Sequence, residues 1–527
     1  MTSDQAAGRA RDRLRLHRSR VTGYWLLVTG YWLLVTLNSS RPIPTILALD
    51  QGTTGSTALV VGPDGRILGR GTREIPQHFP APGEVEHDPE QLLQATVAAG
   101  REALAAAGVA VDAIGITNQR ETLVVWDHAS MVPIGRAIVW QDRRTAARCA
   151  ELREAGHEDD IRARTGLLLD PYFSATKLEW LLRDPLLRER AEAGTLRVGT
   201  VESWLVARLT GGLHLSDPTN SSRTMLAALA TGEWDPWLLA LFGVPRGVLP
   251  TIVPSAGVVG HAKAEWFGRP IPIAGLAGDQ QAALFGQGCV TPGSAKITYG
   301  TGAFLLRHAG TIGPETPDQG ILATIAAGPA GERAWALEGS VFVAGAAVQW
   351  LRDGLGVIGH ASETAAMAAS VPDSGGVVVV PAFTGLGAPY WNAEARGTIT
   401  GLTRGTTRAH LVRATLEAVA HGTADLVTAM GGVTTLRVDG GAAANDWLMQ
   451  TQADLLGVPV ERPAAVELTA YGAARLAAIG IGGSLPSAAE LGGQTTFAPQ
   501  ASADWRGERR AEWQRAVRAA LEWAGNR

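Results

Sequence analysis

The chain has 527 residues, of which 46% are hydrophobic, and a formal charge of −4 at pH 7. Single hydrophobic cores rarely grow beyond about 250 to 300 residues, so this length predicts two domains. Residues 1–44 hold seven Arg and two Asp, which leaves 39 basic and 48 acidic residues for the rest, a balance that excludes nucleic acid as a partner of the main body.

The chain begins with a basic stretch, residues 9–20, and an immediate tandem copy of the heptad VTGYWLL. The apolar run from Val21 to Leu37 is short for a membrane span of about 20 residues, contains Gly and Thr, and is followed by no convincing cleavage site. We interpret residues 1–44 as a nucleotide-level repeat or an upstream start that is not part of the fold, and expect no stable membrane insertion. A membrane anchor and a partner-binding or disordered arm are the alternatives.

The first organised segment is LALDQGTTGSTALVV, residues 47–61, in which an apolar run ends at Asp50 and a loop of Gly, Thr and Ser follows. A Pro-Asp-Gly turn and another alternating run come next, which predicts strand, loop, strand, turn and strand. The loop lacks the lysine of the usual phosphate-binding loop. Because such loops are commonly plain hairpin turns, its use as a phosphate site depends on support from elsewhere in the chain.

A helix and a strand are predicted next. Asp88 is a capping residue and Pro89 stands at the first helical position of a long Ala/Leu pattern. Residues 113–117, AIGIT, form a buried strand that ends in NQRE. Alternating strands and helices predict an α/β domain, in which ligands collect at the strand ends.

A second organisation starts near residue 290. Residues 294–308 predict a strand, a short Gly/Thr turn that contains Thr301, and a second strand. Residues 436–457 predict a strand, the tripeptide Asp-Gly-Gly, and a helix, and glycine there lets a ligand approach the backbone closely. One β-turn-β loop in each half predicts a duplicated fold that closes on a nucleotide from both sides.

Two carboxylates fit the needs of phosphoryl transfer to a hydroxyl, which requires a held nucleotide, a Mg²⁺ ion and a proton acceptor. Asp50, at the end of the first strand, could orient a hydrated Mg²⁺ through its waters. Asp279 lies in a glycine-flanked break before an Ala-rich segment and could take the hydroxyl proton. The alternative for Asp279 is a helix cap, and the two roles can coexist.

Five further side chains suit a small polyol. Arg120 and Glu121 stand side by side after a strand, and a guanidinium with a carboxylate can fix several hydroxyls at once. The alternative for this pair is a solvated or salt-bridged turn. Tyr172 adds a phenol, and Trp140 and Phe304 could cover a hydrocarbon backbone.

These residues resemble the FGGY carbohydrate kinases over a span from about residue 45 to at least residue 480. The motifs that carry the resemblance are ALDQGTT, VEHDP, ITNQRET, IVWQDRRT, TGLLLDPYFSATK, GDQQAALFGQ, TYGTGAF, LEGSVFVAGAAVQWLRD, PAFTGLGAPYW, GLTRGTTRAHLVRATLEA and RVDGGAAAND. The resemblance implies ATP-dependent phosphorylation of glycerol to sn-glycerol 3-phosphate in a two-domain actin-like (ribonuclease H-like) ATPase fold. It implies a polyol- and phosphate-binding domain over residues 45–288, a nucleotide-binding domain over residues 289–527, and an active site in the cleft between them.

The resemblance also implies individual roles. Asp279 would be the general base. The polyol site would consist of Arg120, Glu121, Tyr172, Asp279 and Gln280, with Trp140 and Phe304 against the carbon atoms. The nucleotide site would consist of Thr53, Thr54, Gly55, Thr301, Gly345, Gln349, Gly441 and Asn445. Asp50 would lie near Mg²⁺ and contact it through water.

This chain departs from the family pattern at three places. The loop that usually reads Gly-Thr-Thr-Ser-Ser-Arg has Gly55 and Thr57 here, so a hydroxyl and a cation are lost, and weaker nucleotide binding or slower transfer is expected. Glu84 stands where Trp is common. Residues 260–273 lack the glycine-rich Arg loop that binds fructose 1,6-bisphosphate in some members, and Glu265 occupies the position of a phosphorylated His. Neither kind of regulation is therefore predicted.

Other substrates and another class of function are the competing interpretations. A pentulose or gluconate kinase of the same family is the nearest, and a non-catalytic actin-like ATPase is more distant. Cys149 and Cys289 lie far apart without nearby His, so we predict neither a disulfide framework nor a zinc site, and a reducing cytoplasm fits. The resemblance implies a homo-oligomer, either a dimer or a tetramer.

Overall fold

The computed structural model describes residues 24–28, 31–35, 43–313, 320–464 and 467–525. The chain divides into two compact units, Met1–Pro42 and Ile43–Arg527.

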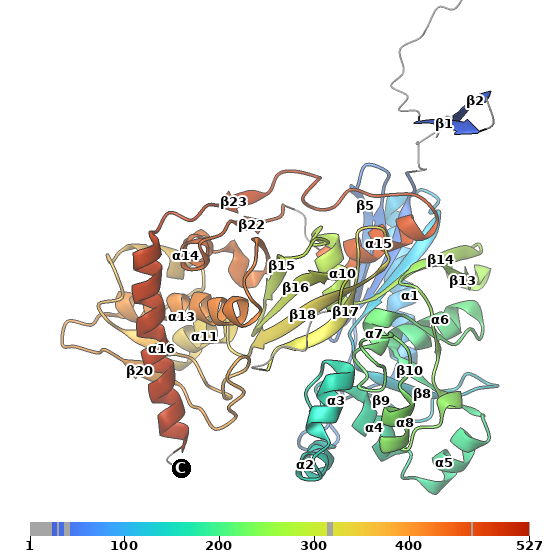
Figure 1. The fold of residues 1–527 in the computed structure, drawn as a ribbon, viewed down its shortest axis with the longest axis horizontal. Coiled ribbons are helices and arrows are strands. Elements are labelled where there is room, and N and C mark those ends of the chain that lie inside the picture. Colours follow the sequence, from blue (N-terminus) through green and yellow to red (C-terminus); the bar gives the residue numbers. More distant parts are fainter. Residues whose placement is uncertain (1–23, 29–30, 36–42, 314–319, 465–466, 526–527) are drawn as a thin grey trace, which may run out of the picture. The chain divides into compact units, whose positions relative to one another are not determined.

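In the first unit the two copies of the repeat pair as an antiparallel hairpin of β1 (Tyr24–Val28) and β2 (Tyr31–Val35) (Figure 1). The sequence interpretation had given this repeat no secondary structure. The basic stretch 9–20 lies outside the described residues. Among the described residues, no helix has the length and apolar character needed to cross a membrane.

A six-stranded sheet organises the N-terminal half of the second unit. In spatial order its strands are β13 (Ala256–Ala262), β14 (Ile271–Gly278), β7 (Ala113–Asn118), β3 (Ile46–Gln51), β4 (Gly55–Val61) and β5 (Ile67–Glu74). The predicted meander is confirmed as β3, β4 and β5, which pair antiparallel in turn. Strands β14, β7 and β3 run parallel, so their carboxyl ends meet at one edge of the sheet.

Helices cover both faces of this sheet. The predicted helix is confirmed as α1 (Pro89–Ala107), whose first turn is capped by Asp88 through the backbone N–H groups of Glu90 and Gln91. Helix α15 (Leu468–Gly480) packs on the sheet so closely that a Cβ on Gly115 would lie 2.2 Å from the Ala473 carbonyl. Figure 1 shows α15, coloured red, beside the blue strands, although α15 lies between β22 and β23 of the C-terminal half in the sequence.

A smaller layer completes the N-terminal half. Its four-stranded sheet has the order β10 (Leu196–Thr200), β8 (Leu123–Asp127), β9 (Ala137–Ile138) and β6 (Glu86–His87), and β11 (Leu215–Ser216) pairs with β12 (Thr251–Ile252). The helices of this half after α1 are α2 (Ala146–Glu154), α3 (Glu158–Thr165), α4 (Ser174–Leu181), α5 (Pro185–Glu192), α6 (Val201–Thr210), α7 (Pro218–Ser221), α8 (Pro236–Leu241), the 3₁₀ turn η1 (Arg246–Val248), α9 (Ala264–Phe267) and α10 (Asp279–Gly286).

A seven-stranded sheet organises the C-terminal half. Its order is β17 (Leu322–Ala327), β18 (Arg333–Val341), β16 (Ala303–Gly310), β15 (Ser294–Tyr299), β21 (Thr435–Gly440), β22 (Val460–Arg462) and β23 (Thr495–Phe497), and β19 (Val378–Val380) pairs with β20 (Thr398–Thr400). The predicted strand-turn-strand is confirmed as β15 and β16. The segment 436–457 also has the predicted order, although the 3₁₀ turn η3 (Gly441–Ala444) stands between β21 and its helix.

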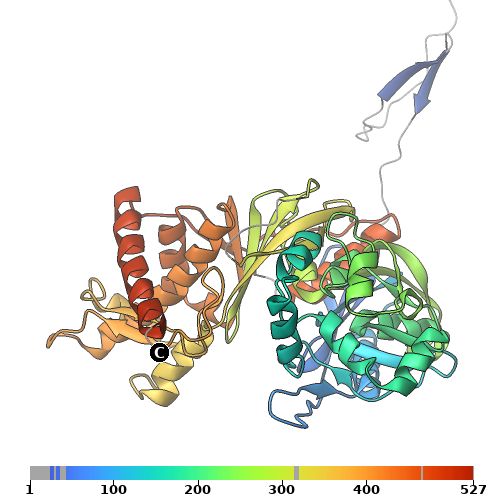
Figure 2. The same ribbon diagram turned by 60° about the horizontal axis from the view of Figure 1, so that its bottom comes forward.

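The remaining helices are α11 (Gly345–Gln349), the π-helical turn η2 (Trp350–Gly354), α12 (Glu363–Ala369), α13 (Arg408–Ala429), α14 (Asp446–Leu456) and α16 (Ala503–Gly525). Helices α13, α14 and α16, coloured orange to red, lie together at the side of the seven-stranded sheet away from the N-terminal half (Figures 1 and 2). The opposite edge of that sheet contacts the N-terminal half, since the Ala323 N–H donates to the Gly166 carbonyl at 2.9 Å. The halves are thus joined along β17 and β18.

Candidate active site

The carboxyl ends of three parallel strands bring the predicted acid and base groups together. Asp50 lies at the end of β3, and the register places it beside Thr117 of β7. Arg120 and Glu121 follow β7 directly, and Asp279 follows β14. Residues separated by more than 200 positions therefore share one edge of one sheet.

Asp279 combines contact to protein with access to solvent. Its Oδ1 accepts the N–H of Gln280 at 2.7 Å and lies 3.2 Å from Nε of Arg120, while 28% of the side chain remains exposed. Burial raises the pKa of its carboxyl, which Arg120 and Lys296 partly offset. Gly278, rather than Asp279, is the N-cap of α10, yet Asp279 accepts a hydrogen bond in the first turn. The carboxylate is positioned to accept a proton from a group in the cleft.

Of the alternative for Arg120 and Glu121, a solvated or salt-bridged turn, the structure excludes the solvated form, because the two side chains form a buried ion pair. Both side chains are buried, and the closest approach between them is 3.9 Å. Arg120 donates to both carboxylate oxygens of Glu338, at 2.7 and 2.9 Å, and Arg223 donates to Glu121 at 2.6 Å. Glu121 has a φ of 61°, an uncommon backbone conformation that is enriched at ligand sites.

Sequence reasoning missed Arg223 and Glu338. Each is buried and each contacts a predicted polyol residue. A signal existed for Glu338, because it is a lone acid within the apolar strand β18 and a buried charge requires a partner.

Tyr172 and Trp140 form one aromatic wall. Their ring centroids are 5.4 Å apart in an edge-to-face arrangement. Lys177, which sequence reasoning also missed, donates to the carbonyls of Trp140 at 3.3 Å and Tyr172 at 3.1 Å, and burial lowers its pKa to about 8. The indole N–H of Trp140 donates to Oγ1 of Thr53 at 3.0 Å, which links this wall to the predicted phosphate loop.

The seven-stranded sheet turns a second set of side chains toward Asp279. The register aligns Phe304 with Thr298 of β15 and Ser340 of β18, and the neighbouring row contains Lys296 and Glu338. Because residues two apart on a strand share a face, Phe304 lies on the same face as these charged groups. Lys296 is buried and donates to the side chains of Gln280 and Thr298. Gln280 is thereby held from the C-terminal half.

The loop after Asp50 is compact. The N–H of Gly52 donates to the Gly55 carbonyl at 2.8 Å, and a Cβ on Gly55 would lie only 2.7 Å from the Arg73 carbonyl. A serine at position 55 would therefore displace β5. Thr57 pairs with Asp50 across β3 and β4, so their side chains share a face.

Asp50 is half-buried, and no side-chain hydrogen bond or ion pair is found for it within the described residues. Burial raises the pKa of its carboxyl, and the negative charges of Asp279 and Glu467 add to the effect. A cation beside Asp50 would reverse that shift. In the described part of the chain, no three His, Cys, Asp or Glu side chains cluster closely enough to hold a metal ion alone.

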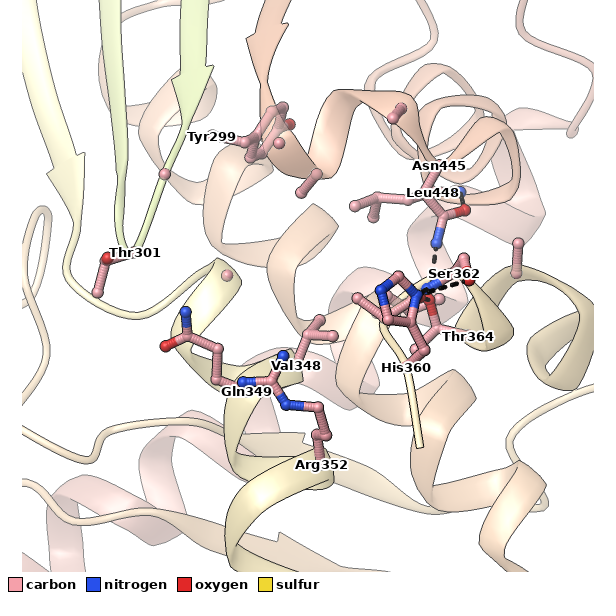
Figure 3. A pocket seen from close by; sticks show the side chains of 18 of the residues that line it. Tyr299, Thr301, Val348, Gln349, Arg352, His360, Ser362, Thr364, Asn445 and Leu448 are labelled. Atoms are coloured by element: carbon pink, nitrogen blue, oxygen red, sulfur yellow. Dashed lines mark hydrogen bonds between the residues drawn. The ribbon is translucent and has the colours of Figure 1, made fainter. Parts of the chain in front are cut away.

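A cavity of about 670 Å³ in the C-terminal half gathers most of the predicted nucleotide residues (Figure 3). Its lining includes Thr301, Gly345, Gln349, Gly441 and Asn445. The lining does not include Thr53, Thr54 or Gly55, which lie in the loop after Asp50.

Backbone groups and neutral side chains dominate this nucleotide cavity. Nothing lies within 4 Å of a Cβ built on Gly441, so the backbone is open to a ligand there. The Asn445 side chain donates to Thr364 at 3.1 Å, and the same Asn445 caps α14 (Figure 3). Arg352, His360, Ser362 and Thr364 also line the cavity and were not predicted.

One departure from the family pattern, Glu84, has a local explanation. Glu84 lies 3.6 Å from Arg144, which also pairs with Glu86 and Asp142 at 2.8 Å. Glu84 therefore adds a carboxylate to an existing ion-pair cluster. Glu265 lies in the short helix α9, where its backbone carbonyl accepts from Arg101 at 2.8 Å, and nothing in the structure explains its side chain.

Models of known families match both halves of the chain. The model of the N-terminal domain of the FGGY family of carbohydrate kinases matches residues 45–286, and that of the C-terminal domain matches residues 295–481. Together they cover most of the second compact unit.

Individual relatives agree with these matches. The chain is 56% identical to a glycerol kinase of Aromatoleum aromaticum over 491 residues, which is 91% of this chain and 99% of that protein. A structure of Plasmodium falciparum glycerol kinase with ADP matches with a TM-score of 0.84 and 32% identity, and covers 90% of this chain and 98% of that one. A xylulose kinase of Rhodospirillum rubrum matches with a TM-score of 0.82 at 26% identity, and covers 91% of this chain and 100% of that one. The predicted two-domain fold is confirmed.

Proposed function

The chain belongs to the FGGY family of carbohydrate kinases, and on that basis we propose that it transfers the γ-phosphoryl group of ATP to glycerol and forms sn-glycerol 3-phosphate. One observation carries the proposal at the level of the site. The Asp279 carboxylate is 28% exposed, lies 3.2 Å from Nε of the buried Arg120 and shares a sheet edge with side chains that suit a small polyol.

Glycerol would bind between the carboxylates of Glu121 and Asp279 on one side and the aromatic wall of Tyr172 and Trp140 on the other. Arg120 would donate a hydrogen bond to one hydroxyl of glycerol, and Glu121 would accept a hydrogen bond from the adjacent hydroxyl. Tyr172 and Gln280 would fix the orientation of the bound glycerol. Trp140 and Phe304 would cover the carbon atoms. With several hydroxyls held, one terminal hydroxyl is presented to Asp279.

Asp279 would act as the general base. Its carboxylate takes the proton of that hydroxyl as the oxygen attacks the γ-phosphorus, and ADP leaves from the opposite side. Burial raises the pKa of this carboxyl, which makes it a stronger proton acceptor than an ordinary aspartate. Lys296 lies on the nucleotide side of the base, so its charge would favour the approach of the phosphoryl group.

ATP would lie in the cavity of the C-terminal half. Gln349 and Asn445 would contact the adenosine, and Thr301, Gly345 and Gly441 would border the phosphates. The loop with Thr53, Thr54 and Gly55 would bind the terminal phosphates from the other half through hydroxyl and backbone N–H groups. Asp50 fits a Mg²⁺ ion held through water, because it is a half-buried carboxylate close to a second negative charge. When bound, Mg²⁺ would supply positive charge that neutralises the phosphate oxygens.

We propose a cytoplasmic location and a homo-oligomer, a dimer or a tetramer, for the enzyme. The free thiols of Cys149 and Cys289, both buried, fit a reducing compartment. Light scattering of the purified chain tests the second proposal, which a monomer would contradict.

The activity is tested by ADP release from ATP and Mg²⁺ with the full-length chain. Glycerol, dihydroxyacetone, xylulose and gluconate are offered separately. We expect the highest kcat/KM with glycerol. Preference for xylulose or gluconate would refute the substrate, and ADP release that depends on no added polyol would indicate an ATPase that is not a polyol kinase.

A further inference from the structure

Glu338 of the C-terminal half reaches into the polyol site of the N-terminal half. Its two carboxylate oxygens accept from Nη1 and Nη2 of Arg120 at 2.7 and 2.9 Å, and one of them also accepts from Arg223 at 3.2 Å. The side chains of Arg120, Arg223 and Glu338 are only 2%, 0% and 4% exposed. All three charges are thus removed from solvent.

These groups form a balanced network with Glu121. Arg223 donates to Glu121 at 2.6 Å, so two guanidinium groups face two carboxylates. Burial alone would raise the pKa of Glu338, but Arg120 and Arg223 outweigh it and lower the pKa to about 2. Glu338 therefore carries its charge at any pH at which the enzyme is used. Removal of one member would leave a buried charge without its partner.

The two-point contact fixes the plane and direction of the Arg120 guanidinium. Such forked pairs restrict orientation more than a single hydrogen bond does. With its outer edge held by Glu338, Arg120 presents Nε toward Asp279 at 3.2 Å. Arg223 holds the Glu121 carboxylate through one hydrogen bond from Nε, while its Nη2 donates to Glu338. Nη1 of Arg223 is buried and has no hydrogen-bond partner within the described residues, so this network retains a donor for a further oxygen.

The strand that carries Glu338 is itself anchored. Strand β18 pairs along its length with β17, whose Ala323 N–H bonds to the Gly166 carbonyl of the other half. The indole N–H of Trp335, also in β18, donates to the Leu229 carbonyl at 3.3 Å. The backbone around Glu338 is therefore fixed with respect to the polyol site.

We propose that Glu338 is a positioning residue for the polyol. It orients the guanidinium groups of Arg120 and Arg223 from the opposite half, so that Arg120 and Glu121 are aligned with the substrate hydroxyls before glycerol binds. This inference rests on the proposed glycerol kinase activity and adds a residue to its substrate recognition.

The test compares glycerol with propane-1,2-diol, which lacks one hydroxyl, in the full-length chain and in the variant Glu338→Gln. Glutamine keeps the size of the side chain but removes the charge and one acceptor. We expect the KM for glycerol to rise roughly tenfold or more, with the KM for ATP within about twofold of its original value. The ratio of kcat/KM for glycerol to kcat/KM for the diol should fall by a similar factor, because a misaligned Arg120 no longer forms a good hydrogen bond with the extra hydroxyl of glycerol.

Glu461→Gln is the matched control. Glu461 pairs with Arg437 at 3.0 Å in the same sheet, so this variant also loses a partly buried ion pair, without contact to the polyol residues. We expect it to keep the original preference. Glu338→Asp, which retains the charge on a shorter side chain, should recover part of the preference. A general loss of structure would lower turnover of both substrates equally and would leave their ratio unchanged.

An unchanged glycerol preference in a folded Glu338→Gln variant would overturn the positioning role. If that variant fails to fold, Arg223→Lys replaces it, since it keeps the charge and loses the fork, and an unchanged preference there would overturn the proposal equally. A parent chain that does not phosphorylate glycerol at all would instead refute the proposed function. The parent chain and Glu461→Gln are therefore measured first.

Discussion

The residues that we assign to the polyol and those that we assign to the nucleotide are built by different means. The polyol side is built from buried charges, Arg120, Glu121, Arg223 and Glu338, which bind one another before any substrate is present. The cavity assigned to the nucleotide is lined by glycine backbone, by neutral Thr, Ser, Gln and Asn side chains and by apolar Val, Leu and Ala side chains, with Arg352 and Asp446 as its charged members. Buried ion pairs require fixed partners, whereas open backbone does not.

This difference predicts that the polyol side discriminates between substrates and that the nucleotide side tolerates substitutions better. A network that is satisfied only in one arrangement rejects a substrate that fits poorly. Substitutions on the nucleotide side should therefore act on the KM for ATP, and substitutions on the polyol side on substrate choice or catalysis. The following changes would sharpen or break that contrast.

The largest effect is expected from Asp279→Asn, which removes the proposed proton acceptor at the junction of the two sides. We expect kcat to fall by roughly 10² to 10⁴-fold, because that is the usual share of general-base catalysis. Glycerol binding, measured by calorimetry, should change much less, since the polyol network stays intact. Near-normal turnover would remove Asp279 from the mechanism.

Gly441→Val tests the nucleotide side alone. A Cβ added at Gly441 meets no protein atom within 4 Å, so the fold leaves room for a side chain at this position in the cavity lining. We expect the KM for ATP to rise roughly tenfold or more while the KM for glycerol is unchanged. Gly507→Val, at another position with open space around it, is the control. A large change in the KM for glycerol would show that the two sides are not independent.

Thr57→Arg restores the cation that relatives commonly have in the phosphate loop. Because Thr57 shares a face with Asp50, the new guanidinium would lie near the terminal phosphates. We expect the KM for ATP to fall by roughly two- to fivefold, the effect of a partly exposed ion pair of ~0.5 to 1 kcal/mol. Thr72→Arg places the same charge one strand farther away and should have a smaller effect. If Thr57→Arg changes neither kcat nor the KM for ATP, the missing cation does not matter in this chain.

The smallest effect is expected on stability, from the buried amine of Lys177 behind the aromatic wall of Tyr172 and Trp140. Burial lowers the pKa of Lys177 from 10.5 to about 8, so between these values the unfolded chain binds more protons at this side chain than the folded chain does. The free energy of unfolding consequently gains a contribution that rises with pH across this window.

Lys177→Met should remove that contribution. We expect the melting temperature of the parent chain, relative to the variant, to rise between pH 8 and pH 10.5. The exposed Lys263→Met serves as the control and should give no such trend. A constant difference between parent and Lys177→Met would show that Lys177 is not a strained buried amine.

Local signals made much of the fold predictable. The Pro-Asp-Gly turn defined the meander of β3, β4 and β5, and Asp88 with Pro89 defined the start of α1, because turns and caps are decided by residues close in sequence. The expectation of an α/β domain placed ligands at the strand ends, whereas the parallel register that brings Asp50 to the same edge as Asp279 came from the structure.

The supporting layer of the site was not predictable in the same way. Glu338 meets Arg120 across 218 positions, a pair that arises only once the two halves pack together, and Arg223 meets Glu121 across 102 positions within the N-terminal half. Lys177 and Lys296 contact carbonyl and amide oxygens that any sequence could supply. The hairpin of β1 and β2 was missed because the repeat was interpreted as a feature of the nucleotide sequence.

The central claim is that a prearranged polyol side presents one terminal hydroxyl of glycerol to Asp279. It is tested most directly by the stereochemistry of the product. Glycerol is prochiral, so the full-length chain is supplied with ATP, Mg²⁺ and glycerol, and the glycerol phosphate formed is resolved by a stereospecific enzymatic assay. We expect the sn-3 isomer alone, and a product that contains comparable amounts of both enantiomers would contradict the claim.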